Sequence, residues 1–320
     1  MSCQNFASTS EGTLAYGVQV ACGTPTTALK ELRFVSETLN LTAATTQSNE
    51  IRPNRNVSDL VRTSTSVGGD ISVEFSYEVY DDFMQALLQS SVALDGAGTE
   101  IKNGVTKKYF TIEKNTPDAS GTNYFTQFTD MQVGGMTMTI AQGAIVTGSF
   151  TMLGSENPVN STTSLDGTGY TAAPTFPVYN SLANVSAVLI DGTTAGNVES
   201  VNFTVTNNLR EQRAIGNVAP AGVASGQFVV TGSVSIYFAS NALYTKFIND
   251  TSFSLEVTID DLTNVGNGNQ YTFRFPKCKF GTVTKNITGN NADVLLQGDF
   301  QAILDGTLAG TMGVESLDAA

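Results

Sequence analysis

Acidic pairs and a few cysteines are the residues of this chain whose type and spacing could support catalysis. The carboxylates of Asp81-Asp82 and Asp260-Asp261 could act as a general acid and base if their pKa values were held apart. The simpler interpretation is a helix cap for the first pair and a turn for the second. Cys22 would be a nucleophile only beside an activating partner, and the sequence shows none.

The 320 residues contain no histidine, which removes His-based triads and most zinc sites. Four Asp-Gly dipeptides could suggest calcium, but none continues with the ligand spacing of an EF-hand, and Asp-Gly is a strong turn signal. They lie at Leu94–Gly96, Leu165–Gly167, Asp191-Gly192 and Leu304–Gly306. We therefore expect no enzyme, no metal and no cofactor, although carboxylate catalysis stays open without support.

The charge of the chain is low in amount and acidic in sign. Charged residues make up 14%, where about 25% is usual. Two interpretations stay open: a surface largely covered by other copies of the chain, or a polar surface rich in Thr and Asn. The net charge of −13 is opposite to the basic footprint that grips nucleic acid, but it permits enclosing DNA that slides past.

The cysteine count and the N-terminus indicate a cytoplasmic protein. The three cysteines, Cys3, Cys22 and Cys278, cannot form a disulfide framework. Met1–Gly12 lacks the basic flank and apolar core of a signal peptide, and no apolar run approaches ~20 residues. We expect a chain that stays soluble until it meets a partner.

The elements that carry these residues are strands, and they occur twice. Ile71–Phe75 and Val234–Phe238 share one apolar alternation, offset by 163 residues. Asp82–Leu88 and Ala242–Ile248 share a helical pattern, with Asp81 and Ser240 or Asn241 as expected N-caps.

Two later blocks continue the match in the same order. Phe128–Met136 matches Phe275–Val283, and Gly148–Met152 matches Gly298–Ala302, with an offset of 150 in the last block. Four colinear blocks favour an internal duplication over chance.

The predicted fold class is all-β with small helices, as two tandem β-sandwich or barrel domains, each with one flanking helix. The predicted organisation is an N-terminal arm at 1–31, a first domain at 32–154, a linker with a possible hairpin at 155–197, a second domain at 198–306 and a C-terminal tail at 307–320. Whether Asn180–Asn197 belongs to the linker or to the second domain stays open.

A long polar stretch follows the first strand of each repeat, at Thr45–Ser66 and Asn207–Gly226. Structureless loops beyond ~15 residues are rare in compact domains unless they have a role. We predict projecting arms that pair with a neighbouring molecule, with a disordered excursion as the alternative.

Several stretches resemble the tail tube proteins of long-tailed phages, in particular the subfamily with an extended N-terminal segment. They are Leu14–Pro25 leading into Leu32–Leu41, Asn49–Arg55, and Tyr77–Phe83. The resemblance covers most of the first repeat and, more weakly, the second.

The resemblance implies a domain of two packed sheets with a flanking helix, six of which join their inner sheets into one barrel around an axis. A duplicated chain then needs three copies for a ring. If each domain gives ~4 strands, ~24 strands spaced ~6 Å along the perimeter enclose a bore of roughly 35–40 Å. A DNA duplex passes such a bore with a layer of water.

The resemblance also gives the polar strand faces a role. Alternation places one set of polar side chains away from the core, and we predict that they line the lumen and repel phosphate, with an ordinary solvated face as the alternative. The predicted lumen residues are Asp70, Ser72, Glu74, Ser76, Gln297, Asp299 and Gln301.

Charged residues of the two arms are predicted to contact the next ring, where the arginines would form salt bridges with an acidic patch. DNA contact is the alternative, and it is less favoured because a lumen that binds DNA would obstruct ejection. They are Glu50, Arg52, Arg55, Asp59, Arg62, Arg210 and Arg213.

The predicted function is a structural tail tube protein that polymerises into stacked rings around passing double-stranded DNA. Its expected partners are other copies of itself and the tail tip, tape measure and terminator proteins, with no membrane. The expected location is the virion tail, assembled in the host cytoplasm. The inner tube of a contractile tail and a surface adhesin or fibre protein stay open as alternatives.

Overall fold

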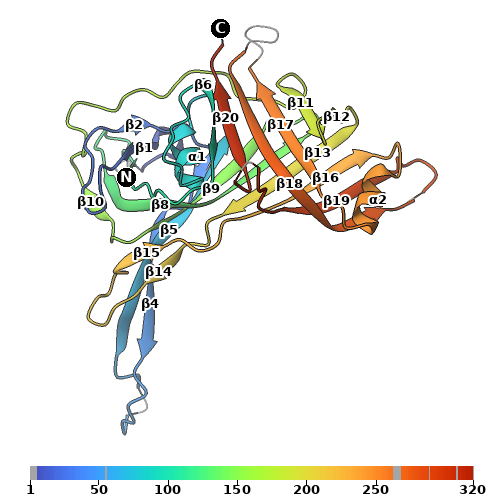
Figure 1. Cartoon of the computed structure of the whole chain (residues 1–320). Coiled ribbons are helices and arrows are strands. Elements are labelled where there is room, and N and C mark those ends of the chain that lie inside the picture. The colour runs from blue at the N-terminus through green and yellow to red at the C-terminus, as the bar shows by residue number, and fades with distance from the viewer. Residues whose placement is uncertain (1–5, 55, 262–267, 288, 308, 320) are drawn as a thin grey trace.

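The computed structural model describes residues 6–54, 56–261, 268–287, 289–307 and 309–319. Within them the fold is all-β with two short α-helices, as the sequence predicts. Figure 1 shows a body of packed sheets from which one long hairpin, formed by β4 and β5, projects.

The first half of the chain contains ten strands, one α-helix and a 3₁₀ turn at Thr9–Glu11. These elements are β1 (Thr13–Val18), β2 (Lys30–Glu31), β3 (Ser36–Glu37), β4 (Asn40–Gln47), β5 (Leu60–Glu74), α1 (Asp81–Leu87), β6 (Ala97–Lys102), β7 (Phe110–Asn115), β8 (Phe125–Ala141), β9 (Thr147–Gly154) and β10 (Val159–Ser161).

The second half repeats this composition. Its elements are β11 (Val185–Ile190), β12 (Thr193–Thr194), β13 (Val198–Thr206), β14 (Arg210–Gln212), β15 (Gly222–Ala224), β16 (Val229–Tyr237), α2 (Ala242–Ile248), β17 (Phe253–Asp260), β18 (Gln270–Lys285), β19 (Leu295–Ala302) and β20 (Gly313–Leu317).

One sheet runs through both halves, and we call it the long sheet. Its order is β4-β5-β9-β8-β13-β16-β19-β18, with every neighbouring pair antiparallel. Each half contributes four strands, and the halves join where β8 pairs with β13.

Each half packs a second sheet against the long sheet. The second sheet of the first half is β2-β1-β7-β8-β10, and that of the second half is β12-β11-β17-β18-β20. The long strands β8 and β18 belong to both sheets, because each pairs with different partners along its two ends. The strand β6 of the first half extends the second sheet of the other half by pairing with β20.

The pairing registers of the two halves superimpose. The row Ile71, Phe150 and Met136 in β5, β9 and β8 corresponds to the row Val234, Gly298 and Val283 in β16, β19 and β18. The offsets are 163, 148 and 147 residues, and the bulge after Val133 in β8 recurs after Phe280 in β18.

The offset of 148 in the last strand corrects the 150 predicted by aligning Gly148 with Gly298. Each glycine makes room for a different phenylalanine ring. A side chain at Gly148 would meet the Phe75 ring, whereas one at Gly298 would meet the Phe280 ring. The two glycines are therefore not equivalent positions.

The core lies between the sheets. Alternate side chains of the long sheet point inward and are buried, including Phe150, Met136, Phe203 and Phe300. Burying a side chain of this size stabilises the fold by roughly 1.5–3 kcal/mol.

Three segments predicted to lie outside the two domains carry strands of these sheets. Within 1–31, β1 pairs with β7 and buries Leu14 and Tyr16. Within 155–197, β10 pairs with β8, and the β11–β12 hairpin pairs with β17. Within 307–320, β20 pairs with β18. These strands are short, so their local patterns were too weak to assign them to a sheet from the sequence.

The Asp-Gly turn signal is clear at one of these hairpins. Asp191 and Gly192 connect β11 to β12 with φ values of 53° and 71°. Two successive residues with positive φ match the tight turn that Asp-Gly favours.

Candidate lumen face, assembly edges and arms

The outward face of the long sheet is a continuous polar surface. One row crosses seven strands through directly paired residues: Ser72, Ser149, Thr137, Thr204, Thr231, Gln301 and Lys279. A second row does the same: Glu74, Thr147, Thr139, Asn202, Ser233, Asp299 and Thr282. Hydroxyl and amide groups dominate both rows.

Charges on this face are few and mostly acidic. Asp70 and Asp299 are exposed, Glu74 is half-buried, and Asp70 accepts a hydrogen bond of 2.6 Å from the Thr151 hydroxyl. Lys279 lies in the first row, but its Nζ is 2.5 Å from a carboxylate oxygen of Asp250. Its positive charge is therefore locally balanced.

The structure places most of the predicted lumen residues on this one face. Ser72, Gln297 and Gln301 lie on it with the three carboxylates, on β5 and β19. Ser76 is a correction: it is fully buried, and its hydroxyl accepts a hydrogen bond of 3.2 Å from Arg33. The alternation fails there because β5 ends at Glu74.

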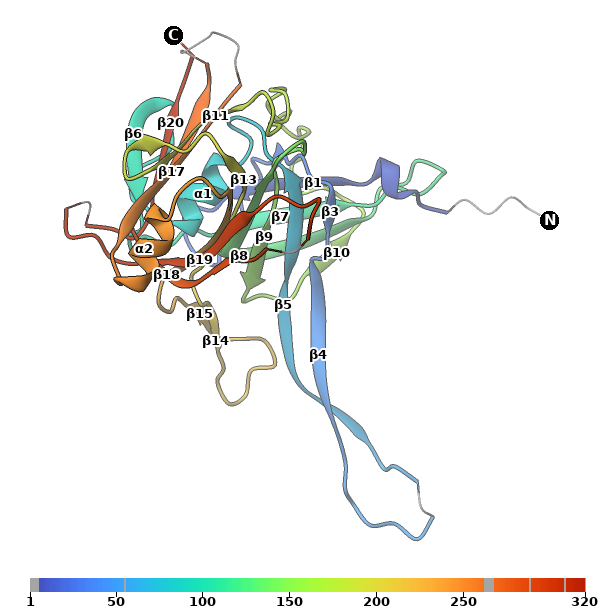
Figure 2. The ribbon, with the colours of Figure 1, turned by 90° about the vertical axis from the view of Figure 1, so that its right-hand side faces the viewer.

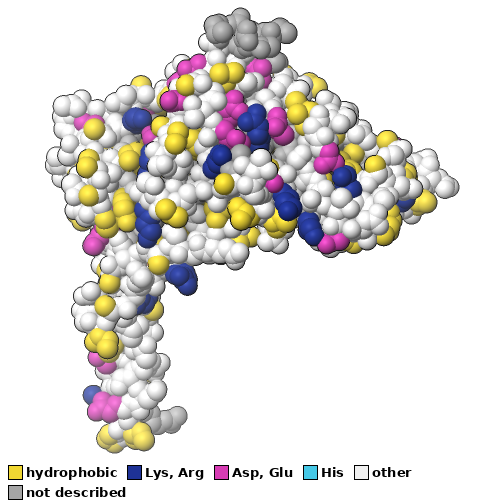
Figure 3. Space-filling model, in the orientation of Figure 1, with side chains coloured by type: hydrophobic (Ala, Val, Ile, Leu, Met, Phe, Trp, Pro, Cys, Tyr) yellow, Lys and Arg dark blue, Asp and Glu magenta, His cyan; other side chains and the backbone are white. Residues whose placement is uncertain are grey.

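The first arm is a β-hairpin made of β4 and the first half of β5. It extends far from the body in two perpendicular views (Figure 1, Figure 2). Its pairs run to Gln47 and Leu60, and Ser48 N–H donates to Asp59 O at 2.9 Å. Residues 42–47 are all exposed, and Ile51 is 99% exposed. Figure 3 shows that most of its surface is uncharged.

The second arm is shorter and folds against the base of the first. Its strands β14 and β15 form a small hairpin. Thr65 N–H donates to Val218 O at 2.9 Å, and the Ser66 hydroxyl donates to the Glu211 carboxylate. The second arm therefore lies against the base of the first, and only the first projects far.

The charged arm residues are exposed, as a contact surface requires. Arg52 pairs with Glu50 at 2.8 Å within the tip, and Arg213 pairs with Glu211. Asp59, Arg62 and Arg210 are exposed as well. Arg55 lies outside the described residues.

The long sheet ends in two strands whose outer edges have no strand partner among the described residues. One edge is β4, and the other is the second half of β18, which pairs with β19 on its inner side alone. Unpaired strand edges are templates for another chain.

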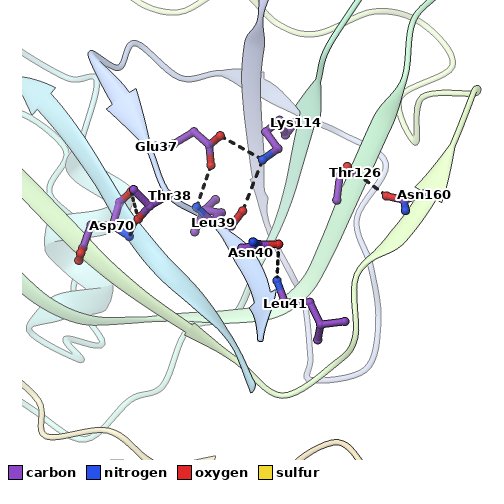
Figure 4. Close-up of polar contacts among 9 residues, drawn as sticks. All are labelled: Glu37, Thr38, Leu39, Asn40, Leu41, Asp70, Lys114, Thr126 and Asn160. Carbon is purple, nitrogen blue, oxygen red and sulfur yellow. Dashed lines mark hydrogen bonds and ion pairs between the residues drawn. The ribbon is translucent and has the colours of Figure 1, made fainter. Parts of the chain in front are cut away.

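Side chains cover the β4 edge (Figure 4). The Glu37 carboxylate accepts from the Leu39 N–H at 2.8 Å and lies 3.0 Å from Lys114 Nζ, which also donates to Leu39 O at 3.4 Å. The Leu41 N–H donates to Asn40 Oδ1 at 2.8 Å. Sequence reasoning missed this cluster, because it depends on long-range packing of β7 beside β4.

Among the candidate catalytic residues, Cys22 lies beside the Asp130 carboxylate. Partial burial and the neighbouring Asp130 carboxylate raise the pKa of the Cys22 thiol, which is opposite to what a nucleophile requires. Burial raises the pKa of Cys278 to about 12. Among the residues that the structure describes, no group of three His, Cys, Asp or Glu could hold a metal ion.

The first acidic pair begins α1 without capping it through a side chain. Asp82 accepts from the Tyr16 hydroxyl at 3.1 Å, and Asp81 accepts from Tyr271 of β18. Burial is the largest cause that raises the pKa of Asp81, the bond from Tyr271 lowers it and nearby carboxylates raise it, and together these effects bring the pKa to about 7. The pair thus links the two halves of the chain.

The other expected caps and the second acidic pair are also local structure. Of the two caps expected for α2, Asn241 makes no side-chain capping bond, and its Oδ1 accepts from Lys285. The Ser240 hydroxyl accepts a hydrogen bond of 3.4 Å from the N–H of Ala242, the first residue of α2. Asp261 accepts from the N–H of Asn269 at 3.0 Å.

Comparison with known families identifies the kind of protein that has this polar sheet face, these free strand edges and these projecting arms. A family model described as phage tail tube protein matches residues 9–302. The chain belongs to the phage tail tube protein family. It is thus a structural protein of a phage virion tail, and membership implies self-assembly into a tube.

No curated protein matches the chain significantly. Over the described parts of the chain, no helix is long and apolar enough to span a membrane. The family match extends across both halves, so it covers all eight strands of the long sheet.

Proposed function

We propose that three copies of this tail tube protein close a ring and that rings stack into a tube through which double-stranded DNA passes. The observation that carries this proposal is the long sheet, which has four strands from each half, one polar face and two free edges. Three such sheets supply 24 strands, the number that gives a bore of roughly 35–40 Å.

The polar face suits the inner wall of this tube. Hydroxyl and amide groups keep water at the surface, and the carboxylates of Asp70, Glu74 and Asp299 repel phosphate. The pairing of Lys279 with Asp250 balances the positive charge of this lysine, which weakens its attraction for phosphate. DNA therefore slides past a wet wall that binds it weakly.

The first arm suits contact between rings. An isolated two-stranded hairpin is marginally stable in water, and this one exposes Ile51, Val57 and Leu60. A neighbouring ring would cover these apolar side chains and pair with the arm charges. At its ends and in its lumen the tube would meet the tail tip, terminator and tape measure proteins.

Ring mass tests the stoichiometry. The protein is concentrated until negative-stain microscopy shows tubes, which are then dissociated and weighed in the native state. Rings of about 101 kDa, three times the 33.7 kDa of one chain, are expected. Rings of six chains would contradict the stoichiometry, and a protein that stays monomeric at every concentration would contradict the tube.

A further inference from the structure

The two halves of one chain already meet in a junction that can be compared with the free edges. In this junction β8 of the first half pairs with β13 of the second, from Gly135–Thr206 to Ala141–Ser200. By the registers above, β18 corresponds to β8, and β3 with β4 corresponds to β13. The two free edges are therefore the same two surfaces that pair inside the chain.

The backbone N–H and C=O groups at the β4 edge point in the directions that this correspondence with β13 requires. Thr38 N–H donates to Asp70 O at 2.9 Å, so residues of that parity, including Asn40 and Thr42, direct their backbone groups toward β5. Leu39 and Leu41 direct theirs outward. In the second half, Asn207 N–H donates to Gly134 O at 2.8 Å, which gives the corresponding parity toward β8.

We propose that β18 of one copy pairs with β4 of the next copy in the register of the internal junction. The internal pair of Gly135 with Thr206 then corresponds to Thr282 opposite Thr42 between copies. The internal pair of Thr137 with Thr204 corresponds to Thr284 opposite Asn40. Val283 and Lys285 form the hydrogen-bonded pairs with Leu41 and Leu39. This proposal rests on the proposed ring and names the surface that closes it.

Burial supports a missing neighbour at the β18 edge. Ile248, the last residue of α2, is 64% exposed, whereas Leu87, the last residue of α1, and Leu88, with which the sequence pattern aligns Ile248, are each 1% exposed. Ile287 is 88% exposed, whereas its counterpart Ile140, opposite Val201, is 5% exposed. The apolar side chains that the internal junction hides are thus open at the other end of the chain.

The contacts that the second half makes with α1 indicate which part of a neighbouring copy would contact α2 in the ring. In the chain, Asn207 Nδ2 donates to Leu87 O at 2.8 Å, and Gln89 Nε2 donates to the Ser225 hydroxyl at 2.7 Å. Both partners lie in the stretch of the second half that follows β13. The corresponding stretch of a second copy is its first arm, in whose paired strands Leu60 and Val61 are exposed.

The β4 edge carries a charged pair, Glu37 and Lys114, that the corresponding edge of β13 lacks. The positions of Glu37 and Lys114 correspond to Val201 and Val257, which are buried. A permanently paired edge can be apolar, whereas an edge that waits for a partner is protected by charge. The Glu37 and Lys114 side chains therefore bond the backbone N–H and C=O of Leu39 in the free chain. When the ring closes, these bonds must break so that Leu39 can pair with β18.

Engineered disulfides test the register. The variant N40C/T284C, with Cys3 and Cys22 changed to Ser and the buried Cys278 kept, places two cysteines in a pair that is not hydrogen-bonded. The Cα atoms of such pairs lie ~4.5 Å apart, within disulfide range. T42C/T282C is a second pair in register. N40C/T282C is the matched control, because a diagonal offset of ~7–8 Å is too long to bridge.

Oxidation of assembled tubes with copper phenanthroline is expected to convert most of each in-register variant into covalent rings of three chains on a denaturing gel. The control is expected to stay at least tenfold less cross-linked. Tubes that form without cross-links in register, or a control that cross-links equally well, would overturn the register and leave the proposed tube standing. Absence of any ring, seen before oxidation, would instead contradict the proposed function.

Discussion

At the residue scale, the alternation of residues along a strand predicts which side chains lie on the polar face of the long sheet, but not which distant residues they contact. The outward positions of Asp70, Glu74 and Asp299 follow from a local period of two, which a strand imposes whatever its neighbours are. The prediction that Ser76 points outward fails because the strand has ended before it. Its hydroxyl instead accepts a hydrogen bond from Arg33 of a distant segment. The pairs Lys279–Asp250 and Glu37–Lys114 join residues 29 and 77 positions apart, so no local pattern reveals them.

Reversing the charge of this face should make DNA adhere. In the variant D70K/E74K/D299K the charge changes by six per chain, and each Lys within reach of phosphate can release a counterion. Rings and tubes should form normally, because the three side chains lie outside the core. Particles should look complete but infect poorly, and tubes should retain DNA with an affinity that falls about 10³-fold or more between 50 and 200 mM salt if six or more phosphates are contacted.

The neutral variant D70N/E74Q/D299N is the control for lost carboxylates, and it should infect nearly as well as the wild type. Wild-type infectivity of the Lys variant would show that these residues do not line the bore or that their charge has no effect. An unfolded Lys variant would place the side chains in the core, against the observed exposure.

Stability should fall as pH rises through the range in which Asp81 titrates. Burial raises the pKa of Asp81 to about 7, above the unfolded value near 3.9, so the folded state prefers the protonated form. The contribution is fully present below about pH 4, is lost between about pH 4 and 7 and is absent above that range. Its slope is at most about 1.4 kcal/mol per pH unit.

Urea unfolding of the wild type and of D81N at several pH values measures this contribution. D81N should lose the part of the pH dependence between pH 4 and 7, while the control E31Q, at an exposed position, should keep it. Identical slopes for the wild type and D81N would show that Asp81 ionises with an ordinary pKa.

At the scale of elements, the first arm shows a partial success of sequence reasoning. The length and polarity of Thr45–Ser66 predict a projection, and the hairpin of β4 and β5 projects. The equal length of Asn207–Gly226 does not predict that its hairpin folds against Thr65 and Ser66, because this packing depends on the register between the halves.

Deleting Asn49–Asp59 should leave a folded, soluble chain that closes rings but does not stack them. The deleted tip contributes nothing to the core, so the melting temperature should stay within a few degrees of the wild type. Microscopy should then show single rings in place of tubes.

The substitution I51S is a milder version of the same experiment, since a side chain that is 99% exposed can lose contacts only with another molecule. It should raise the concentration needed for tubes without changing the melting temperature. Long tubes from the deletion variant would refute the role of the arm.

At the scale of the whole molecule, the chain contains one complete junction and the two halves of another. The internal β8–β13 ladder joins its halves permanently, and the free edges of β4 and β18 leave the same surfaces for other copies. The duplication was visible in the sequence as four colinear blocks. The equivalence of edges was not, because it follows from strand order and pairing register.

The most direct measurement is a cryo-electron microscopy reconstruction of the assembled tube at a resolution that shows side chains. We expect three chains per ring, one barrel of 24 strands and a bore lined by the row from Ser72 to Lys279, with Asp70, Glu74 and Asp299 facing the DNA channel. A bore lined by the second sheets or by the arms, with the hydroxyl-rich face turned outward or buried between rings, would contradict it.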